Sequence, residues 1–299
     1  MVRLKKFYIM ILSLSLMLCG CSDKGENYPS DYPDSPTYSE EEILYPENPG
    51  ENLIQSSIAN VDYSHVDLGY VMAYLNNKSE KKIKIQISTS IQTYNYDLTS
   101  TEPVAFPMQM GNGEYLIKVL ENTQGDEYAI VKSQKINVVL KDELTPFLYP
   151  NQLVNYQKGD IITKKSIELV QEDTNDLQRI RNIYDYVVHY LDYDNDKATI
   201  ATTKYILPNL TELFESKKGI CFDYAAMMVA MLRINHIPAR LICGNTDIEY
   251  HAWVEVYLEG AGWVNPDTFI DEKVWTRMDP TFASSKFNYK GQYEAVYYY

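Results

Sequence analysis

The sequence predicts a small antiparallel β-sandwich followed by an α+β domain. Hydrophobic and polar residues alternate between about residues 60 and 140, which is typical of strands with one buried face. After Pro146 and Pro150 the hydrophobic spacing changes to that of helices, and strand-like segments follow these helices. We therefore expect a sandwich over residues 56–142 and an α+β domain over 143–299.

Residues 1–20 have the pattern of a secretory signal peptide. Three basic residues precede an apolar run over residues 7–18, and no acidic residue interrupts it. At helical rise this run covers about 18 Å, which is shorter than the roughly 30 Å hydrocarbon core of a bilayer. A signal peptide is therefore favoured over a transmembrane helix.

The end of this segment resembles the lipobox of bacterial lipoproteins. It reads Leu18-Cys19-Gly20-Cys21, with small residues before the second cysteine. The resemblance implies that Cys21 is acylated and becomes the new N-terminus. A diacylglyceryl group on Cys21 supplies the two chains that stable anchoring in a lipid bilayer requires. We then expect the protein at the cell membrane, on its extracytoplasmic face; an ordinary signal peptide is the alternative.

Residues 21–55 predict a disordered acidic tether. Between residues 22 and 51 there are nine acidic residues, five prolines and four tyrosines, but one lysine and few aliphatic residues. Such a composition buries too little apolar surface to offset the entropy of ordering the chain.

The predicted sandwich is immunoglobulin-like in outline. Ile83, Ile85 and Ile87 alternate with polar residues, and further strand-like segments are separated by turn signals such as Gly111-Asn112-Gly113. This region has one histidine, His65, and no cysteine. It carries no recognisable catalytic chemistry, and a spacer and a binding module are both consistent with it.

The α+β domain begins with two helical patterns. Apolar residues recur at helical spacing from Leu177 to Leu191, after the N-cap candidates Thr174 and Asn175. A second pattern starts just after Cys221 and ends before Pro238. The strands expected after it cover residues 240–243, 251–258, 274–278 and 293–299.

Three segments of this domain carry a resemblance to a known family. They are GICFDYAAMMVAMLRINHIPAR, HAWVEVYLEGAGWV and WTRMDPTFASS, in that order. They resemble the signature blocks of the bacterial transglutaminase-like superfamily, over about residues 160–299. The resemblance implies a papain-like fold and a thiol site with the chain order Cys, His, Asp, which maps onto Cys221, His251 and Asp279.

The position of Cys221 independently suggests a nucleophile. It opens a predicted helix, where unpaired N–H groups and the positive end of the helix dipole favour a thiolate and can hold an oxyanion. A buried structural cysteine is the alternative, and it fits the middle of an apolar helix better. Cys243 lies in an apolar strand and is interpreted as a core residue without a role.

His251 is the candidate general acid and base. It begins a predicted strand and can present its ring to a helix start packed across that strand. A histidine alone is more often structural, so this interpretation depends on Cys221. His189, His236 and His65 are poorer candidates because of their positions in the predicted elements.

Two aspartates compete for the third position. Asp279 ends a predicted strand and precedes Pro280, as the family pattern implies, and it is favoured over Asp267. Turn formation is the alternative role for both. The segment between Gly260 and Asp279 is longer than the hairpin that the family often has there. Tyr193 is a further candidate, as an oxyanion donor.

Composition and motifs exclude other chemistry. The formal net charge of −14 gives no electrostatic basis for nucleic-acid binding. The sequence has no phosphate-binding loop, no dinucleotide fingerprint and no zinc spacing, so we expect neither a cofactor nor a metal. Asp192, Asp194 and Asp196 imitate the start of a calcium loop, but Lys197 stands where that loop needs glycine.

The sequence therefore predicts a surface-anchored, cysteine-dependent acyl-transfer enzyme. We expect a thioester on Cys221 formed from an amide bond of a protein or peptide, with cell-wall peptides among the candidates. Transfer to an amine would give crosslinks, and transfer to water would give deamidation or peptide hydrolysis. The alternative is a non-enzymatic surface module for binding or display on the same scaffold.

Overall fold

The computed structural model describes residues 32–265, 267–287 and 289–299. The predicted signal peptide, the first part of the predicted tether and Cys21 lie outside the described residues. Within these described ranges, no helix combines the length and the apolar character needed to cross a bilayer.

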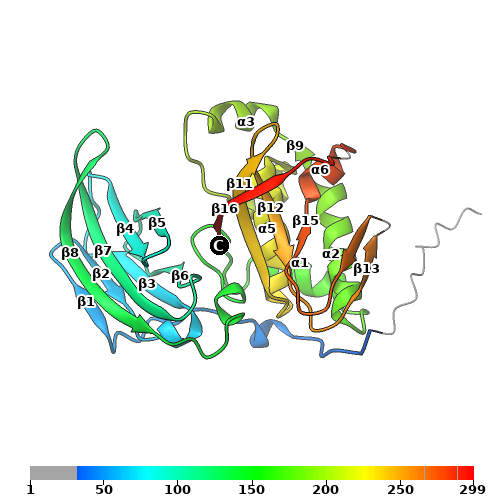
Figure 1. Cartoon of the computed structure of the whole chain (residues 1–299), viewed down its shortest axis with the longest axis horizontal. Coiled ribbons are helices and arrows are strands. Elements are labelled where there is room, and N and C mark those ends of the chain that lie inside the picture. The colour runs from blue at the N-terminus through cyan, green and yellow to red at the C-terminus, as the bar shows by residue number, and fades with distance from the viewer. Residues whose placement is uncertain (1–31, 266, 288) are drawn as a thin grey trace, which may run out of the picture. The chain divides into compact units, whose positions relative to one another are not determined.

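The first half of the described chain forms two four-stranded antiparallel sheets (Figure 1). One has the strand order β1-β2-β3-β6 and the other β5-β4-β7-β8. The eight strands are β1 (Leu53–Gln55), β2 (Ala59–Asp62), β3 (Tyr70–Leu75), β4 (Ile83–Ser88), β5 (Thr93–Asp97), β6 (Val104–Pro107), β7 (Gly113–Gln124) and β8 (Glu127–Val138).

The side chains of both sheets share one core. The three isoleucines of β4 are buried, and the polar residues between them are not. Tyr94 and Tyr96 of β5 face the same core. The alternation that predicts these strands follows from the pleat, which turns every second side chain inward. The immunoglobulin-like outline itself stays a prediction.

Residues 32–55 are ordered, which corrects the expectation of a disordered tether for this segment. Ile43 is buried in the core of the second half, and Ser35 hydrogen-bonds to Asp176 and Arg179. Residues Glu40–Glu42 form a 3-10 helix, and β1 begins at Leu53. The segment has few aliphatic residues, but these few and several tyrosines find partners on the folded chain, which composition alone does not reveal.

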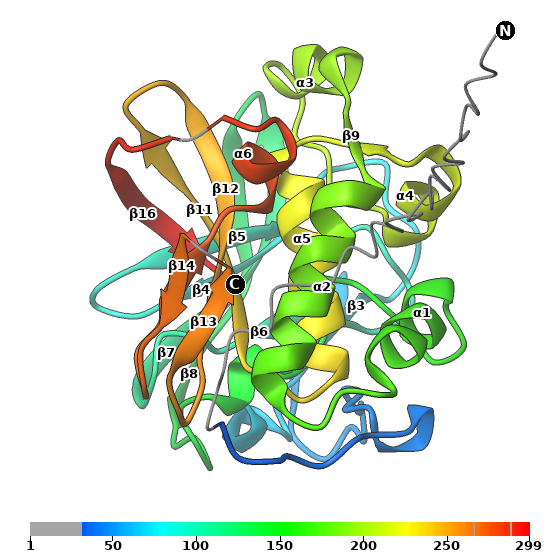
Figure 2. The same cartoon turned by 90° about the vertical axis from the view of Figure 1, so that its right-hand side faces the viewer.

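The second half contains helices and a four-stranded antiparallel sheet with the order β15-β12-β11-β16. Figures 1 and 2 show α1, α2 and α5 on one face of this sheet. The helices are α1 (Ile161–Val170), α2 (Asp176–Tyr190), α3 (Asn195–Ala201), α4 (Leu210–Ser216), α5 (Cys221–Ile234) and α6 (Pro280–Ser284). The strands are β9 (Asp192–Tyr193), β10 (Lys218–Gly219), β11 (Ala239–Thr246), β12 (Tyr250–Val256), β13 (Gly262–Asn265), β14 (Thr268–Ile270), β15 (Thr276–Met278) and β16 (Tyr293–Tyr298).

Helix α5 is the central element of this half. Every residue from Asp223 to Ile234 is buried, and the helix packs against β11, β12, α1 and α2. A helix that is apolar on all sides lies in the interior, since no face of it is suited to water. The core therefore surrounds α5, while its first residue, Cys221, remains half-buried. The α+β arrangement expected from the sequence is confirmed, and Asn175 is the N-cap of α2.

The last strand, β16, contacts both halves of the described chain. It pairs with β11, and the rings of Tyr297 and Tyr299 pack on the core of the first half. Gln109 Nε2 donates to the Tyr298 carbonyl oxygen at 3.2 Å. The tyrosine-rich end of the sequence thus serves as a shared packing surface.

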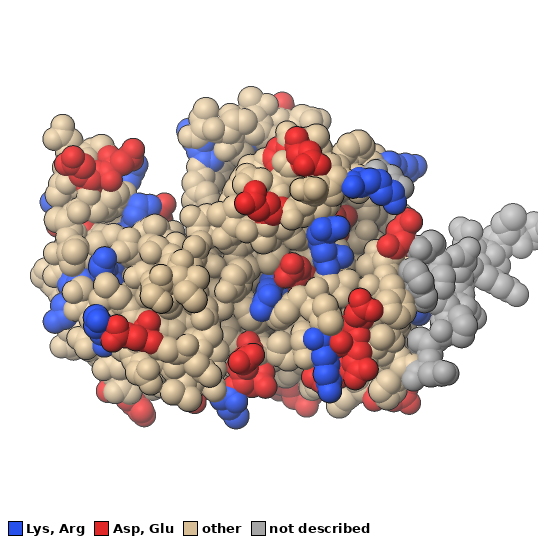
Figure 3. Space-filling view, in the orientation of Figure 1, with Lys and Arg blue, Asp and Glu red and all other residues tan. Residues whose placement is uncertain are grey.

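Basic and acidic side chains are interspersed over the face of the molecule that Figure 3 shows. Neither sign of charge dominates the surface on this face.

Candidate active site

Cys221 is the first residue of α5 and has a free thiol. The N–H groups of a first helical turn have no carbonyl partner within the helix, so they remain available to an anion. Gly219 lies just before this turn, and a Cβ at that position would lie 2.7 Å from the Asp223 Cβ. The glycine is therefore needed for the close approach of the chain to the helix start.

A buried ion pair fixes this helix start. The Asp223 carboxylate accepts a hydrogen bond from the Ile220 N–H at 2.9 Å and contacts Lys197 Nζ of α3 at 2.8 Å. Burial raises the pKa of Asp223, and the hydrogen bonds from Lys197 and Ile220 oppose this. Lys197 thus offsets part of the cost of burying this capping carboxylate.

His251 lies near the start of β12, opposite Gly244 of β11. Its side chain is almost completely buried, and Nε2 lies 2.8 Å from Asp279 Oδ2. The ring stacks on Phe282 with a centroid distance of 4.2 Å and an interplanar angle of 7°. Strand pairing and stacking together hold the imidazole in one orientation.

Asp279 is the N-cap of α6. Its Oδ1 accepts hydrogen bonds from the N–H groups of Thr281 and Phe282, at 3.1 and 3.0 Å. Its Oδ2 accepts hydrogen bonds from His251 Nε2 and from the Tyr293 hydroxyl, both at 2.8 Å. The carboxylate is thus held by four donors, and its orientation is set by the helix that it caps.

The other candidate, Asp267, lies elsewhere. It is exposed in the turn between β13 and β14, where its N–H donates to Asn265 Oδ1 at 2.9 Å. The carboxylate partner of His251 is therefore Asp279, as the strand-end position favoured. The long segment between His251 and Asp279 forms the β13–β14 hairpin.

The pKa of the His251 ring is strongly shifted from its ordinary value. Burial lowers the pKa of His251, but its interactions with Asp279 and Cys221 outweigh burial and raise that pKa to about 9. Nε2 is used by Asp279, so Nδ1 is the ring nitrogen left for the thiol. Nδ1 is buried without a hydrogen-bond partner of regular geometry, and it lies 3.6 Å from Glu249 Oε1. The structure thus brings Cys221, His251 and Asp279 together, with the imidazole between the thiol and the carboxylate.

Tyr193 lies beside the same helix start. It belongs to β9, which pairs in parallel with β10, so that Tyr193 is opposite Gly219. Burial, then the nearby Cys221 and Glu249, raises the pKa of Tyr193 to about 12. The phenol is therefore protonated at neutral pH and can donate a hydrogen bond to an oxyanion.

Two exposed tyrosines, Tyr193 and Tyr250, lie near the thiol, and a third, Tyr205, lies beside the residue that follows Cys221. We call the three the tyrosine rim; their exposed fractions are 40% for Tyr193, 65% for Tyr205 and 58% for Tyr250. Cys221 is among the groups that raise the pKa of both Tyr193 and Tyr250. The Tyr205 ring lies 6.2 Å from the ring of Phe222, the residue after Cys221. Exposed large aromatic residues next to a reactive group offer apolar contact area to a ligand.

The second cysteine of the described chain has a different environment. Cys243 packs against the core around α5, and burial raises the pKa of its thiol far above the usual range. This thiol therefore stays protonated, as expected of a core residue.

Sequence reasoning missed several residues of the site. Tyr293 and Phe282 contact His251 or its carboxylate, and Glu249 lies next to the ring. Tyr293 was interpreted only as a strand residue, because nothing in the chain pattern relates β16 to α6. Phe282 had a usable signal, since it lies three residues after Asp279 and thus in the turn that this residue caps.

No group of three or more histidine, cysteine or acidic side chains suited to a metal occurs in the described ranges. Asp194, part of the run that imitates a calcium loop, is instead the N-cap of α3 and accepts a hydrogen bond from the Lys197 N–H at 2.9 Å.

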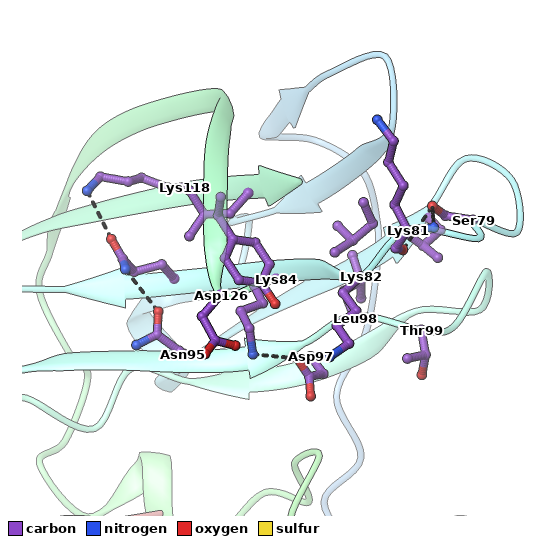
Figure 4. A pocket seen from close by; sticks show the side chains of 15 residues that line it. Ser79, Lys81, Lys82, Lys84, Asn95, Asp97, Leu98, Thr99, Lys118 and Asp126 are labelled. Atoms are coloured by element: carbon purple, nitrogen blue, oxygen red, sulfur yellow. Dashed lines mark hydrogen bonds and ion pairs between the residues drawn. The ribbon is translucent and has the colours of Figure 1, made fainter. Parts of the chain in front are cut away.

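A depression of about 770 Å³ lies on the sheet that contains β4 and β7, away from these residues (Figure 4). Lys118 Nζ donates to Gln86, which donates to Asn95, and Lys84 pairs with Asp97. These five lining side chains thus already satisfy one another.

Comparison with known proteins places this site in a family context. Residues 163–268 match the family model described as the transglutaminase-like superfamily, so this part of the chain, which contains both helices and strands, is similar to transglutaminase-like domains. The matched range includes Cys221 and His251, and Asp279 lies beyond its end.

Two kinds of curated relative match this chain. Uncharacterized protein YebA of Bacillus subtilis (strain 168) is 30% identical over an alignment of 123 residues, and the match covers 33% of this chain and 16% of the relative. The kyphoscoliosis peptidase of Mus musculus is 29% identical, and the match covers 31% of this chain and 16% of that protein. The kyphoscoliosis peptidase of Homo sapiens is also 29% identical, and the match covers 36% of this chain and 19% of that protein. The matches thus span less than a fifth of each relative.

Solved structures with low similarity also match. A structure titled as a putative cysteine protease from Cytophaga hutchinsonii is 14% identical, with a TM-score of 0.35 over 77% of this chain and 91% of that one. Red sea bream transglutaminase is 12% identical, with a TM-score of 0.32 over 71% and 48% of the two chains. At these TM-scores the two likenesses add no detail to the family match.

Proposed function

We propose that this protein is a cysteine-dependent acyl-transfer enzyme that acts on amide bonds of proteins or peptides. One observation carries the proposal: the buried His251 ring lies between Asp279 Oδ2, at 2.8 Å, and the Cys221 thiol at the start of α5. A raised imidazole pKa next to a thiol favours the ion pair of thiolate and imidazolium, which is the reactive form of such sites.

The first half-reaction transfers the acyl group to sulfur. The Cys221 thiolate attacks the amide carbonyl carbon, and the oxyanion is held by N–H groups of the first turn of α5, with the Tyr193 hydroxyl as a second donor. The C–N bond then breaks, and the His251 imidazolium gives its proton to the departing amine. A thioester and a neutral imidazole remain, and Asp279 keeps the ring oriented throughout.

The second half-reaction restores the site. An amine or a water molecule gives a proton to His251 and attacks the thioester, and the thiolate leaves. An amine yields a new amide bond, and water yields a carboxylic acid. The products are a crosslink in the first case and a deamidated or cleaved chain in the second.

The tyrosine rim supports a peptide as the acyl donor. Its three phenol rings offer flat apolar faces with polar tips, which suit a peptide with apolar side chains next to the reacting amide. Glu249 is half exposed and lies 3.6 Å from the His251 ring, so one acidic group lies beside the reacting residues.

We propose further that the protein is anchored through Cys21 at the extracytoplasmic face of the cell membrane. This part rests on the lipobox resemblance alone. Expression of the full chain in a bacterial host, with Cys21→Ala as the matched variant, tests it: we expect the unchanged chain in the membrane fraction with the mass of an acylated Cys21. Recovery of both chains in the same soluble fraction would contradict anchoring.

The activity can be tested with the purified full chain. A glutamine-rich protein is offered with a fluorescent primary amine, and release of new N-termini and of ammonia is followed in parallel. We expect a Cys221 thioester by intact-mass analysis at early times, and its absence in Cys221→Ala. If neither products nor a thioester form with the unchanged chain, the non-enzymatic module replaces this proposal.

A further inference from the structure

The Tyr293 hydroxyl shares an acceptor atom with the His251 ring. Asp279 Oδ2 lies 2.8 Å from the hydroxyl oxygen and 2.8 Å from His251 Nε2. The other carboxylate oxygen is used by two backbone N–H groups of α6. Rotation of the carboxylate away from the ring would therefore break the bond to Tyr293 as well as the bond to His251.

Tyr293 is itself held from several sides. Its ring meets the edge of Trp253 at a centroid distance of 5.0 Å, and the Arg277 guanidinium lies 3.9 Å from the ring centroid. Tyr293 is the first residue of β16, which pairs with β11. Next to this pairing, a Cβ at Gly244 would lie 2.1 Å from the Glu294 carbonyl oxygen, so glycine is needed for β16 to approach. The hydroxyl is thus directed to the carboxylate by a strand that is paired with β11 and by the packing of the ring.

The direction of this hydrogen bond follows from charge. Burial, followed by the Asp279 carboxylate, raises the pKa of Tyr293, so the phenol stays protonated and donates. A hydrogen-bond donor stabilises the negative charge on Asp279 Oδ2. The electrostatic attraction between this oxygen and the protonated His251 ring is therefore weaker than it would be without the Tyr293 hydroxyl.

We propose that Tyr293 is a positioning residue of the catalytic site. Its hydroxyl fixes the orientation of the Asp279 carboxylate and weakens the electrostatic attraction between this carboxylate and the protonated His251 ring. This inference rests on the proposed function, because positioning matters only if His251 transfers protons. The charged and titratable groups facing the ring are Asp279, Cys221, Glu249 and Tyr293. Arg277 does not face the His251 ring directly, since its guanidinium lies over the ring of Tyr293.

The test compares Tyr293→Phe with Tyr289→Phe in the full chain. Both changes remove one hydroxyl, and the two rings lie 5.2 Å apart, but the Tyr289 hydroxyl bonds to Asp247 and the Gln292 carbonyl instead. The pKa of the His251 ring is measured by NMR titration of histidine-labelled protein, with assignment from His251→Gln. We expect Tyr293→Phe to raise this pKa by about half a unit or more, and Tyr289→Phe to leave it unchanged.

Kinetics supply the second measurement. We expect Tyr293→Phe to lower kcat about 5-fold with KM within about 2-fold, since Tyr293 acts through Asp279 rather than on substrate. An unchanged His251 pKa and an unchanged kcat in Tyr293→Phe would overturn the inference. The titration needs no substrate, so it tests the role of Tyr293 even if no acyl transfer is found. A lack of acyl transfer would count against the proposed function and not against the role of Tyr293.

A third measurement covers the case that Tyr293→Phe does not fold. In protein labelled with [ζ-¹³C]tyrosine, the hydroxyl proton of Tyr293 is expected to exchange slowly with solvent, and about 10-fold faster or more in Asp279→Asn. Equal exchange rates in the two proteins would show that the carboxylate does not hold this hydroxyl.

Discussion

His251 Nε2 and Asp279 Oδ2 lie 2.8 Å apart, although 28 positions separate the two residues in the chain. Strands β12 and β15 pair directly before Asp279, with Val254 opposite Met278. The pairing of β12 with β15 therefore places the Asp279 carboxylate next to the His251 ring. The first turn of α6, which Asp279 caps, sets the orientation of this carboxylate.

We predict that Cys221 is the only reactive thiol of the described residues. Alkylation with iodoacetamide at about pH 6 should label Cys221 at least about 10-fold faster than a free cysteine, because this thiol lies at a helix start beside the His251 ring. Peptide mapping of the labelled protein is the measurement. Cys243→Ala should keep the labelling and the activity, and equal labelling of the two cysteines would contradict this prediction.

The pH dependence of acyl transfer follows from the raised pKa of His251. The imidazolium is the proton donor for the departing amine, so kcat/KM should fall as pH rises through about 9. An unperturbed histidine would instead lose its proton near its ordinary pKa of 6.5. A pH–rate profile from 5 to 10 checks this, and an alkaline decline near pH 6.5 would show that Asp279 and Cys221 do not hold the proton on the ring.

Asp279→Asn should separate the charge of this side chain from its capping role. Asparagine also caps helices, so we expect the start of α6 to stay as it is. The imidazolium loses its anionic partner, and kcat/KM should fall on the order of 100-fold or more. Asp267→Asn is the matched control and should have near-normal activity; a similar loss in both variants would contradict the assignment.

The tyrosine rim should affect substrate binding more than chemistry. Tyr205→Ala removes an exposed ring beside Phe222, and we expect KM for peptide donors to rise about 3- to 10-fold with kcat nearly unchanged. Tyr128→Ala, in the depression of Figure 4, is the control and should leave both constants as they are. A fall of kcat without a change of KM would assign Tyr205 another role.

Lys197→Met should destabilise the start of α5. The change leaves the buried Asp223 carboxylate without its cationic partner, which we expect to cost about 2 kcal/mol of unfolding free energy. Urea denaturation measures this cost, with the exposed Lys204→Met as a control expected to be near zero. Since Asp223 also holds the Ile220 N–H, alkylation of Cys221 should slow in Lys197→Met.

The principal helices and strands were predictable because the spacing of apolar residues that identifies them is a local property of the chain. The alternating isoleucines of β4 and the apolar faces of α2 and α5 follow from which side chains water disfavours. Residues 32–55 were misinterpreted, because Ile43 and Ser35 are stabilised by partners that lie more than 100 residues away along the chain.

The sequence alone determined the helix start at Cys221, the strand that carries His251 and the strand end at Asp279, because caps, glycines and prolines act on neighbouring residues. Tertiary structure decided which carboxylate reaches the imidazole, that Tyr293 shares this carboxylate, and that the pKa of the ring is raised. Those properties depend on burial and on distances of a few ångströms between strands remote in sequence, and no local pattern encodes such distances.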